Sequence, residues 1–174
     1  TTGRNDFVTM KVAHDNQYLY FYAQTAASIT SSAGEGWMWL LIDADQNAST
    51  GWQGYDYLVN GVPADASHTT LEKCSGTAWS WTAEQNIAYR VTGNQIEMQV
   101  PRAAVGLSRS SGDLKFDFHW VDNPQPGLKV RGSSVAADPA MFWLNGDNAP
   151  ARRFNYRYRG IDENSVSFAA YNLQ

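Results

Sequence analysis

Apolar and polar residues alternate with a period of two along most of this chain, and this pattern restricts the fold more than any other feature. Successive side chains of a β-strand point to opposite faces, so strict alternation predicts strands with one buried face. The apolar sets are Val8, Met10 and Val12; Ile87, Tyr89 and Val91; Ile96, Met98 and Val100; Leu114, Phe116, Phe118 and Trp120; Phe154, Tyr156 and Tyr158; and Val166 and Phe168. The chain is therefore expected to consist mainly of strands.

The segments between these sets support the same fold class. Residues 18–23 are rich in aromatics, and residues 37–42 are apolar on both faces, as expected of a central strand that is covered on each side. Gly93-Asn94 separates two alternating runs and predicts a tight hairpin turn. Helical periodicity is confined to one short turn at 101–107. We predict an all-β fold, an antiparallel β-sandwich of the jelly-roll or immunoglobulin-like two-sheet type.

Size and composition limit the classes of protein. A chain of 174 residues is expected to form a single domain over residues 1–174. The net charge of −4 disfavours nucleic-acid binding, and the longest apolar run, 37–42, is far too short to cross a bilayer. Cys74 is the single cysteine, which excludes an intrachain disulfide. Because the first residues are polar and do not resemble a signal peptide, we expect a mature product or a piece of a longer protein.

Oxygen-bearing side chains gather directly after the apolar segment 37–42. Asp43, Asp45 and Asn47 stand at alternate positions, and Asp56 follows a little further on. Such side chains can converge on one hard cation, and Ca²⁺ takes about six to eight oxygen ligands. The alternative is an Asx-rich turn held by local hydrogen bonds. We favour a structural calcium site, because several carboxylates in one turn repel one another unless a cation neutralises them.

The same region resembles a known family. Residues 42–57 read IDADQNASTGWQGYDY and resemble a run found in family 9-like carbohydrate-binding modules and in the related DOMON-type β-sandwiches. Further similar segments follow the order of the family, at residues 15–22, 93–102 and 116–123. The resemblance implies a secreted bacterial module, often attached to a polysaccharide-degrading enzyme and frequently containing structural calcium.

Sugar binding would need flat aromatic faces, so the seven tryptophans must be divided between core and surface. Trp120 lies on an apolar strand face, and Trp37 and Trp39 lie in the doubly apolar segment, so we assign all three to the core.

The remaining tryptophans are candidates for carbohydrate binding. Trp79 and Trp81 share one face of a short, polar-flanked segment, where a core role and a binding role are equally compatible. Trp52 stands in the glycine-rich loop, where it is either exposed for binding or clamps the loop onto the sheet. Trp143 is a weaker candidate.

Other chemistry finds little support. No catalytic residues are predicted, because His14, His68 and His119 stand in no catalytic or metal-binding motif. Some DOMON-type proteins bind haem through a Met and a His. We favour this alternative less, because we expect a histidine on a polar strand face, such as His119, to lie at the surface. The residues that this alternative would use are Met10, Met38, Met98 or Met141, with His119 or His68.

The arginines Arg152, Arg153, Arg157 and Arg159 are expected to form surface ion pairs rather than an acidic-glycan site.

The sequence thus predicts a non-catalytic polysaccharide-binding module that binds structural calcium through Asp43, Asp45, Asn47 and Asp56, and sugar through Trp79, Trp81 and Trp52. Its expected partners are a polysaccharide or oligosaccharide ligand and a covalently linked catalytic domain, with no nucleic acid or membrane. We expect a monomer that is secreted or displayed on a bacterial surface. The alternatives are a haem-binding electron-transfer domain and a structural spacer without a ligand.

Overall fold

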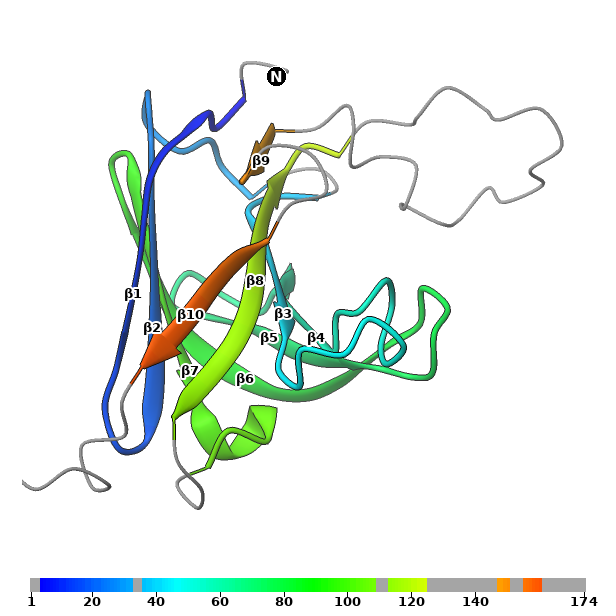
Figure 1. Cartoon of the computed structure of the whole chain (residues 1–174). Coiled ribbons are helices and arrows are strands. Elements are labelled where there is room, and N and C mark those ends of the chain that lie inside the picture. The colour runs from blue at the N-terminus through cyan, green and yellow to red at the C-terminus, as the bar shows by residue number, and fades with distance from the viewer. Residues whose placement is uncertain (1–3, 33–35, 109–112, 125–146, 151–154, 161–174) are drawn as a thin grey trace, which may run out of the picture.

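The structure is a computed structural model that describes residues 4–32, 36–108, 113–124, 147–150 and 155–160. These residues form strands and one short 3₁₀ helix (Figure 1). In chain order the elements are β1 (Phe7–His14), β2 (Tyr18–Thr25), β3 (Trp39–Asp43), β4 (Tyr57–Pro63), β5 (His68–Cys74), β6 (Trp81–Thr92), β7 (Gln95–Pro101), η1 (Arg102–Val105), β8 (Leu114–Asp122), β9 (Asp147–Ala149) and β10 (Tyr156–Gly160).

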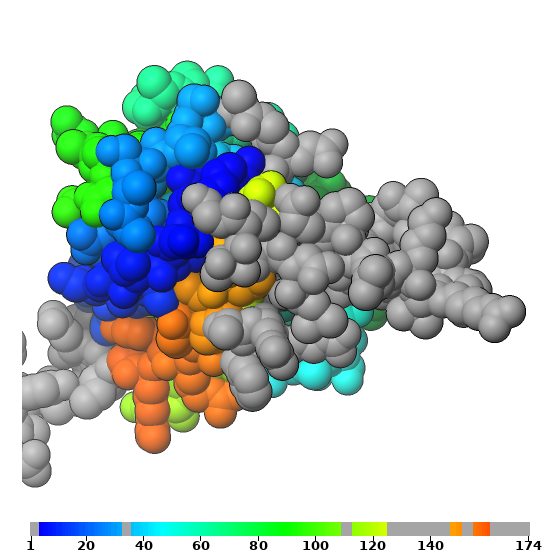
Figure 2. All heavy atoms as spheres, turned by 90° about the horizontal axis from the view of Figure 1, so that it is seen from above, coloured from blue at the N-terminus to red at the C-terminus, as the bar shows by residue number. Residues whose placement is uncertain are grey.

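All the described strands pair antiparallel in one sheet of order β1-β2-β7-β6-β5-β4-β3-β8-β10, with β9 also paired to β8. The sheet curls until its ends approach each other, so that β1 and β10 lie side by side (Figure 1). Nδ1 of His14 in β1 lies 2.6 Å from the hydroxyl of Tyr158 in β10. The view from above shows β1 (blue) against the described residues near the C-terminal end (orange) (Figure 2).

This arrangement confirms the all-β, antiparallel prediction. It does not confirm a β-sandwich, because the described strands form one continuous sheet that nearly closes into a barrel. In the described ranges no backbone ladder joins β1 to β10, and side chains connect β1 to the other end of the sheet: the rings of Phe7 in β1 and Trp120 in β8, the neighbour of β10, are 5.9 Å apart.

The interior is filled by the alternating residues of the strands. Phe21 of β2 contacts Phe116 and Phe118 of β8 with ring centroids 5.7 and 5.5 Å apart, which joins opposite sides of the sheet. Trp120 is 0% exposed and Trp37 is 5% exposed, and both belong to this core, as predicted.

Two local predictions are also confirmed. Gly93 and Asn94 connect β6 to β7 as a two-residue turn, and Gly93 has a φ of +59°. The short helical turn is a 3₁₀ helix at Arg102–Val105, which ends at Gly106 in the left-handed conformation.

Two apolar side chains depart from their expected faces. The register between β1 and β2 shifts between Phe7 and Thr9, and this bulge turns Val8 outward, where it is 55% exposed. Trp39 was predicted to lie in the core, but it is only partly buried and packs in a separate cluster on the outer side of the sheet.

The polar face predicted for β8 is largely buried. Asp117 is 8% exposed and His119 is 0% exposed, so the expectation that His119 lies at the surface is wrong. Asn148 of β9, Arg157 of β10 and Tyr55 before β4 contact this face of β8. Its polar side chains are therefore buried and hydrogen-bonded rather than exposed to solvent.

Phe154, Val166, Phe168, Met141, Trp143, Arg152 and Arg153 lie outside the described residues. Among the residues that the structure does describe, no helix has the length and apolar character needed to span a membrane.

Candidate functional site

The β3–β4 hairpin brings two of the predicted calcium ligands together. Ile42 pairs with Tyr57, so Asp43 at the end of β3 and Asp56 just before β4 occupy facing positions. The Asp56 N–H donates to the Ile42 carbonyl at 2.9 Å, and Oδ2 of Asp56 accepts a hydrogen bond from the Ala44 N–H at 2.9 Å. These contacts hold the Asp56 carboxylate at the end of the hairpin where Asp43 stands.

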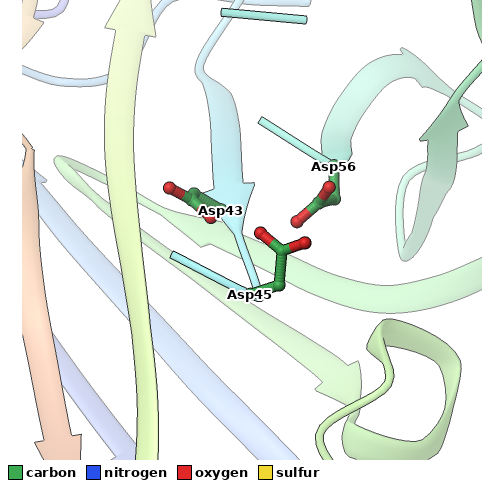
Figure 3. A group of neighbouring side chains, drawn as sticks. All are labelled: Asp43, Asp45 and Asp56. Atoms are coloured by element: carbon green, nitrogen blue, oxygen red, sulfur yellow. The ribbon is translucent and has the colours of Figure 1, made fainter. Parts of the chain in front are cut away.

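Asp45 completes an acidic triad with Asp43 and Asp56. The three carboxylates gather at the end of β3 (Figure 3). One oxygen from each lies within 4.8 Å of the other two. Oxygens bound to one calcium ion at about 2.3–2.6 Å are separated by similar distances, so the triad is compatible with a shared cation.

The Asx-rich turn expected as the alternative is also present. Oδ1 of Asp45 accepts a hydrogen bond from the Asn47 N–H at 2.9 Å, and Oδ1 of Asn47 accepts one from the Ser49 N–H at 3.0 Å. The Thr50 hydroxyl donates to Asp45 as well. A carboxylate has about four acceptor sites, so these bonds leave Asp45 able to bind a cation. The participation of Asn47 in a metal site stays a prediction.

The charges of the triad are poorly compensated. Burial raises the pKa of Asp43 to about 6, the negative charges of Asp56 and Asp45 add to this, and the backbone amides of Gln46 and Asn47 partly oppose it. Burial also raises the pKa of Asp56. Oδ1 of Asp43 is buried and has no hydrogen-bond partner within the described part of the chain. A buried carboxylate oxygen without a partner among the described residues retains the capacity to bind a cation.

Asp117 provides a contrast within the same row of residues. It pairs with Asp43 across β3 and β8, yet it receives two hydrogen bonds of 2.9 Å from Arg157 and one of 2.8 Å from Gln46. Burial acts to raise the pKa of Asp117, but the bonds from Arg157 and Gln46 outweigh it and hold the pKa below its usual value. In the described ranges, no Arg or Lys forms an ion pair with the triad.

The predicted surface ion pairs of the arginine-rich segment are confirmed for its two described members. Arg157 pairs with Asp117, and Nη2 of Arg159 lies 2.8 Å from Oδ2 of Asp113. Both arginine side chains are 70% exposed.

A tight turn inside the loop between β3 and β4 carries Trp52. Trp52 and Tyr55 exchange backbone hydrogen bonds of 2.9 Å around Gln53 and Gly54, whose φ angles of +53° and +94° suit a type I′ turn. Gly51 has a φ of +62°, and a Cβ there would lie 2.0 Å from the Tyr55 carbonyl oxygen. Trp52 is 1% exposed, so it clamps the loop onto the sheet and has no free ring face for a ligand.

The clamp belongs to an outer aromatic cluster, which we define as Trp39, Trp52, Tyr55, Trp79 and Trp81. Trp79 is its centre, with ring centroids 4.6 Å from Trp52, 5.1 Å from Trp81 and 5.4 Å from Trp39. The loop of the acidic triad and the β5–β6 connection are therefore joined through indole contacts.

Trp79 and Trp81 are both partly buried in this cluster. Trp81 faces outward because the register between β5 and β6 shifts between Leu71 and Glu72, which reverses the faces of β6 beyond that point. The indole N–H of Trp81 is buried without a hydrogen-bond partner in the described residues. Among the described aromatic residues, Trp81 contacts fewer rings than Trp79 does, so Trp81 is the better candidate for contact with a ligand.

His119 is a buried polar residue that the sequence did not reveal as such. Its Nε2 lies 3.0 Å from Oδ1 of Asn148 in β9, and its ring centroid is 6.5 Å from that of Tyr55. The partner Asn148 is distant in sequence and carries no recognisable motif. Nothing in the sequence could have identified the pair.

The arrangement does not favour haem binding by the described methionines. Met38 and Met98 are buried in the inner core and Met10 packs against it, whereas His119 contacts Tyr55 on the outer side. His68 is exposed and lies beside Asp65. The described methionines therefore belong to the inner core, whereas His119 lies on the outer side of the sheet and His68 is exposed.

In comparisons with known proteins, no family model matches the chain, and no curated protein or solved structure shows significant similarity to it.

Proposed function

We propose that this chain is a non-catalytic carbohydrate-binding module with a structural calcium ion. The observation that carries the proposal is the acidic triad of Asp43, Asp45 and Asp56, whose carboxylates converge within 4.8 Å with no ion pair to any described Arg or Lys. Carboxylates with this spacing and without a close ion pair favour a divalent cation with oxygen ligands.

The calcium ion would act on the sugar site through the loop between β3 and β4. It would hold Asp45 and Asp56, which flank the turn that carries Trp52. Trp52 contacts Trp79, and Trp79 contacts Trp81. Calcium would therefore help to position Trp81, the tryptophan that is best able to contact a pyranose ring, through its contact with Trp79.

The rest of the proposal follows from the sequence resemblance. We propose that the curled sheet corresponds to a two-layer β-sandwich and that the chain forms a single domain. We also propose that a bacterium secretes the protein and that the module is attached to a carbohydrate-active enzyme. A structural spacer without a ligand is the alternative that the following experiment separates from it.

The test is affinity electrophoresis through gels that contain soluble polysaccharides, including β-glucan, xylan and mannan, with calcium or with EGTA. We expect at least one polysaccharide to retard the protein, and Trp81→Ala to reduce this retardation while leaving the far-ultraviolet circular dichroism unchanged. No retardation across the panel would favour the spacer. Release of reducing ends from a retained polysaccharide would contradict the non-catalytic assignment.

A further inference from the structure

A shallow hollow lies on the outer face of β2, β7 and β6, at the far end of β6 from Trp81. Its volume of about 400 Å³ falls within the range of about 300–1,000 Å³ that is typical of small-molecule sites. The strand register arranges its outward side chains in two rows. One row consists of Tyr22, Glu97 and Arg90, and the other of Tyr20, Gln99 and Ala88.

The two tyrosines give the hollow its aromatic surface. Tyr20 is 37% exposed, although its neighbours Leu19 and Phe21 are fully buried on the opposite face of β2. Ala88 stands at the β6 end of the row of Tyr20, next to Gln99, and its small side chain leaves that end of the hollow open.

Tyr20 is held in place before any ligand arrives. Its hydroxyl donates a hydrogen bond of 2.7 Å to Oδ2 of Asp15. Oδ1 of the same carboxylate accepts hydrogen bonds of 2.7 Å from the N–H groups of Gln17 and Tyr18. A ring fixed in this way loses little conformational entropy when a ligand packs on it.

The polar groups around the tyrosines retain free hydrogen-bonding capacity. Arg90 and Glu97 are exposed, and neither side chain takes part in a hydrogen bond or ion pair with other described residues. Gln99 of β7, between β2 and β6, adds a planar amide that also interacts with the Tyr20 hydroxyl. These planar groups match the paired hydroxyls of a sugar ring.

The charges around the hollow are balanced. Arg90 is opposed by Glu97 in its own row, and Lys11, which lies 5.4 Å from the ring centroid of Tyr22, is opposed by Asp15 beside Tyr20. A strongly charged ligand gains nothing from such a surface, so the chemistry favours a neutral one.

We propose that this hollow is a second binding site, separate from the outer aromatic cluster, and that it takes a neutral pyranose unit of a glycan chain. The C–H face of the sugar packs on Tyr20 and Tyr22, and its hydroxyls bond to Arg90, Glu97 and Gln99. The class of ligand rests on the proposed function, whereas the position of the site rests on the geometry of this face.

The experiment titrates the calcium-loaded full chain with cellohexaose, xylohexaose, mannohexaose and hexagalacturonate and follows the backbone amides by NMR. We expect one of the neutral hexasaccharides to shift the amides of residues 20–22, 88–90 and 97–99. Tyr20→Ala should weaken this binding about tenfold, since loss of one stacked ring corresponds to about that factor. Tyr20→Phe should retain it within about twofold, because the ring face remains. Val62→Ala, at an exposed apolar residue of β4, is the control and should bind normally.

The outcomes separate this site from the proposed function. If a neutral sugar shifts only amides around Trp79 and Trp81, and binding is lost in Trp81→Ala but not in Tyr20→Ala, carbohydrate binding stands and the second site is overturned. Stronger binding of hexagalacturonate than of the neutral sugars overturns the assignment of a neutral ligand. Absence of any shift with all four probes overturns both proposals. The amide shifts of the unmodified chain decide the position even if Tyr20→Ala proves unstable.

Discussion

Asp43 and Asp56 face each other at one end of the β3–β4 hairpin, and their carboxylate oxygens lie within 4.8 Å although no described Arg or Lys forms an ion pair with either residue. Mutual repulsion of these carboxylates destabilises the ion-free chain at neutral pH, and a bound cation would convert the same geometry into stabilisation.

The first prediction concerns pH in the absence of calcium. The pKa of Asp43 is about 6 in the folded chain, above its ordinary value of 3.8, so the folded state binds a proton more readily than the unfolded state. Stability in EGTA should therefore increase as the pH falls from 7 toward 4.5, through the protonation of Asp43. The increase should be on the order of 1 kcal/mol, because one pKa unit corresponds to about 1.4 kcal/mol and water screens part of the effect.

Urea denaturation at a series of pH values measures this change, with Asp43→Asn as the control. The variant carries no titrating group at this position, so it should lack this part of the pH dependence. If the free energies of unfolding of the unmodified chain and the variant changed with pH in parallel, Asp43 would have its ordinary pKa, which would contradict the prediction.

The second prediction concerns the loop. Gly51→Ala should destabilise the chain by about 2 kcal/mol or more, because the added Cβ would lie 2.0 Å from the Tyr55 carbonyl oxygen at a φ of +62°. Gly93→Ala is a matched control, since Gly93 has a φ of +59° but no atom within 4 Å of the added Cβ. Its cost should be only that of the positive φ, about 1 kcal/mol. Equal losses of stability in thermal unfolding would contradict the close approach at Gly51.

The third prediction separates the core from the outer aromatic cluster. Trp120→Ala should lower the free energy of unfolding by roughly 3–5 kcal/mol, because the indole is fully buried and contacts Phe7. Trp81 is only partly buried, so Trp81→Ala should cost less than half as much. Guanidinium denaturation compares the two. A loss for Trp81→Ala as large as that for Trp120→Ala would make Trp81 a structural residue.

The strands could be predicted from the sequence because alternation is a local property of the chain. The hairpin at Gly93-Asn94, the core position of Trp120 and the helical turn after Pro101 all follow from residues that are neighbours in sequence. The acidic residues at 43–56 could likewise be selected as a group, because a single hairpin holds them.

What could not be predicted depends on register and on distant strands. One extra residue in β1 turns Val8 outward, and a register shift between β5 and β6 turns Trp81 outward. Alternation alone cannot locate such bulges. The burial of His119 depends on Asn148 of β9 and on Tyr55, and the curled sheet depends on contacts between its first and last strands. These are tertiary relationships that no local pattern encodes.

The fourth prediction tests the ion pair beside the triad. Arg157→Ala should lower stability at pH 7 because the buried carboxylate of Asp117 loses the two hydrogen bonds from Arg157 and keeps only the one from Gln46. The pKa of Asp117 is lowered in the folded chain, so this contribution is present above its ordinary pKa and is lost as the pH falls through the folded value. The difference between the two proteins in urea denaturation should therefore shrink in acid. Arg159→Ala, whose partner Asp113 is more exposed, should have a smaller effect at pH 7.

Calcium binding itself is the most direct test of the account. Equilibrium dialysis of the full chain, first freed of metal with EGTA, against ⁴⁵Ca²⁺ measures the number of ions bound per chain. We predict one ion per chain, and at least about tenfold weaker binding in Asp45→Ala, which removes one carboxylate of the triad. Failure of the unmodified chain to bind calcium at millimolar concentration would contradict the assignment of the acidic triad as a calcium site.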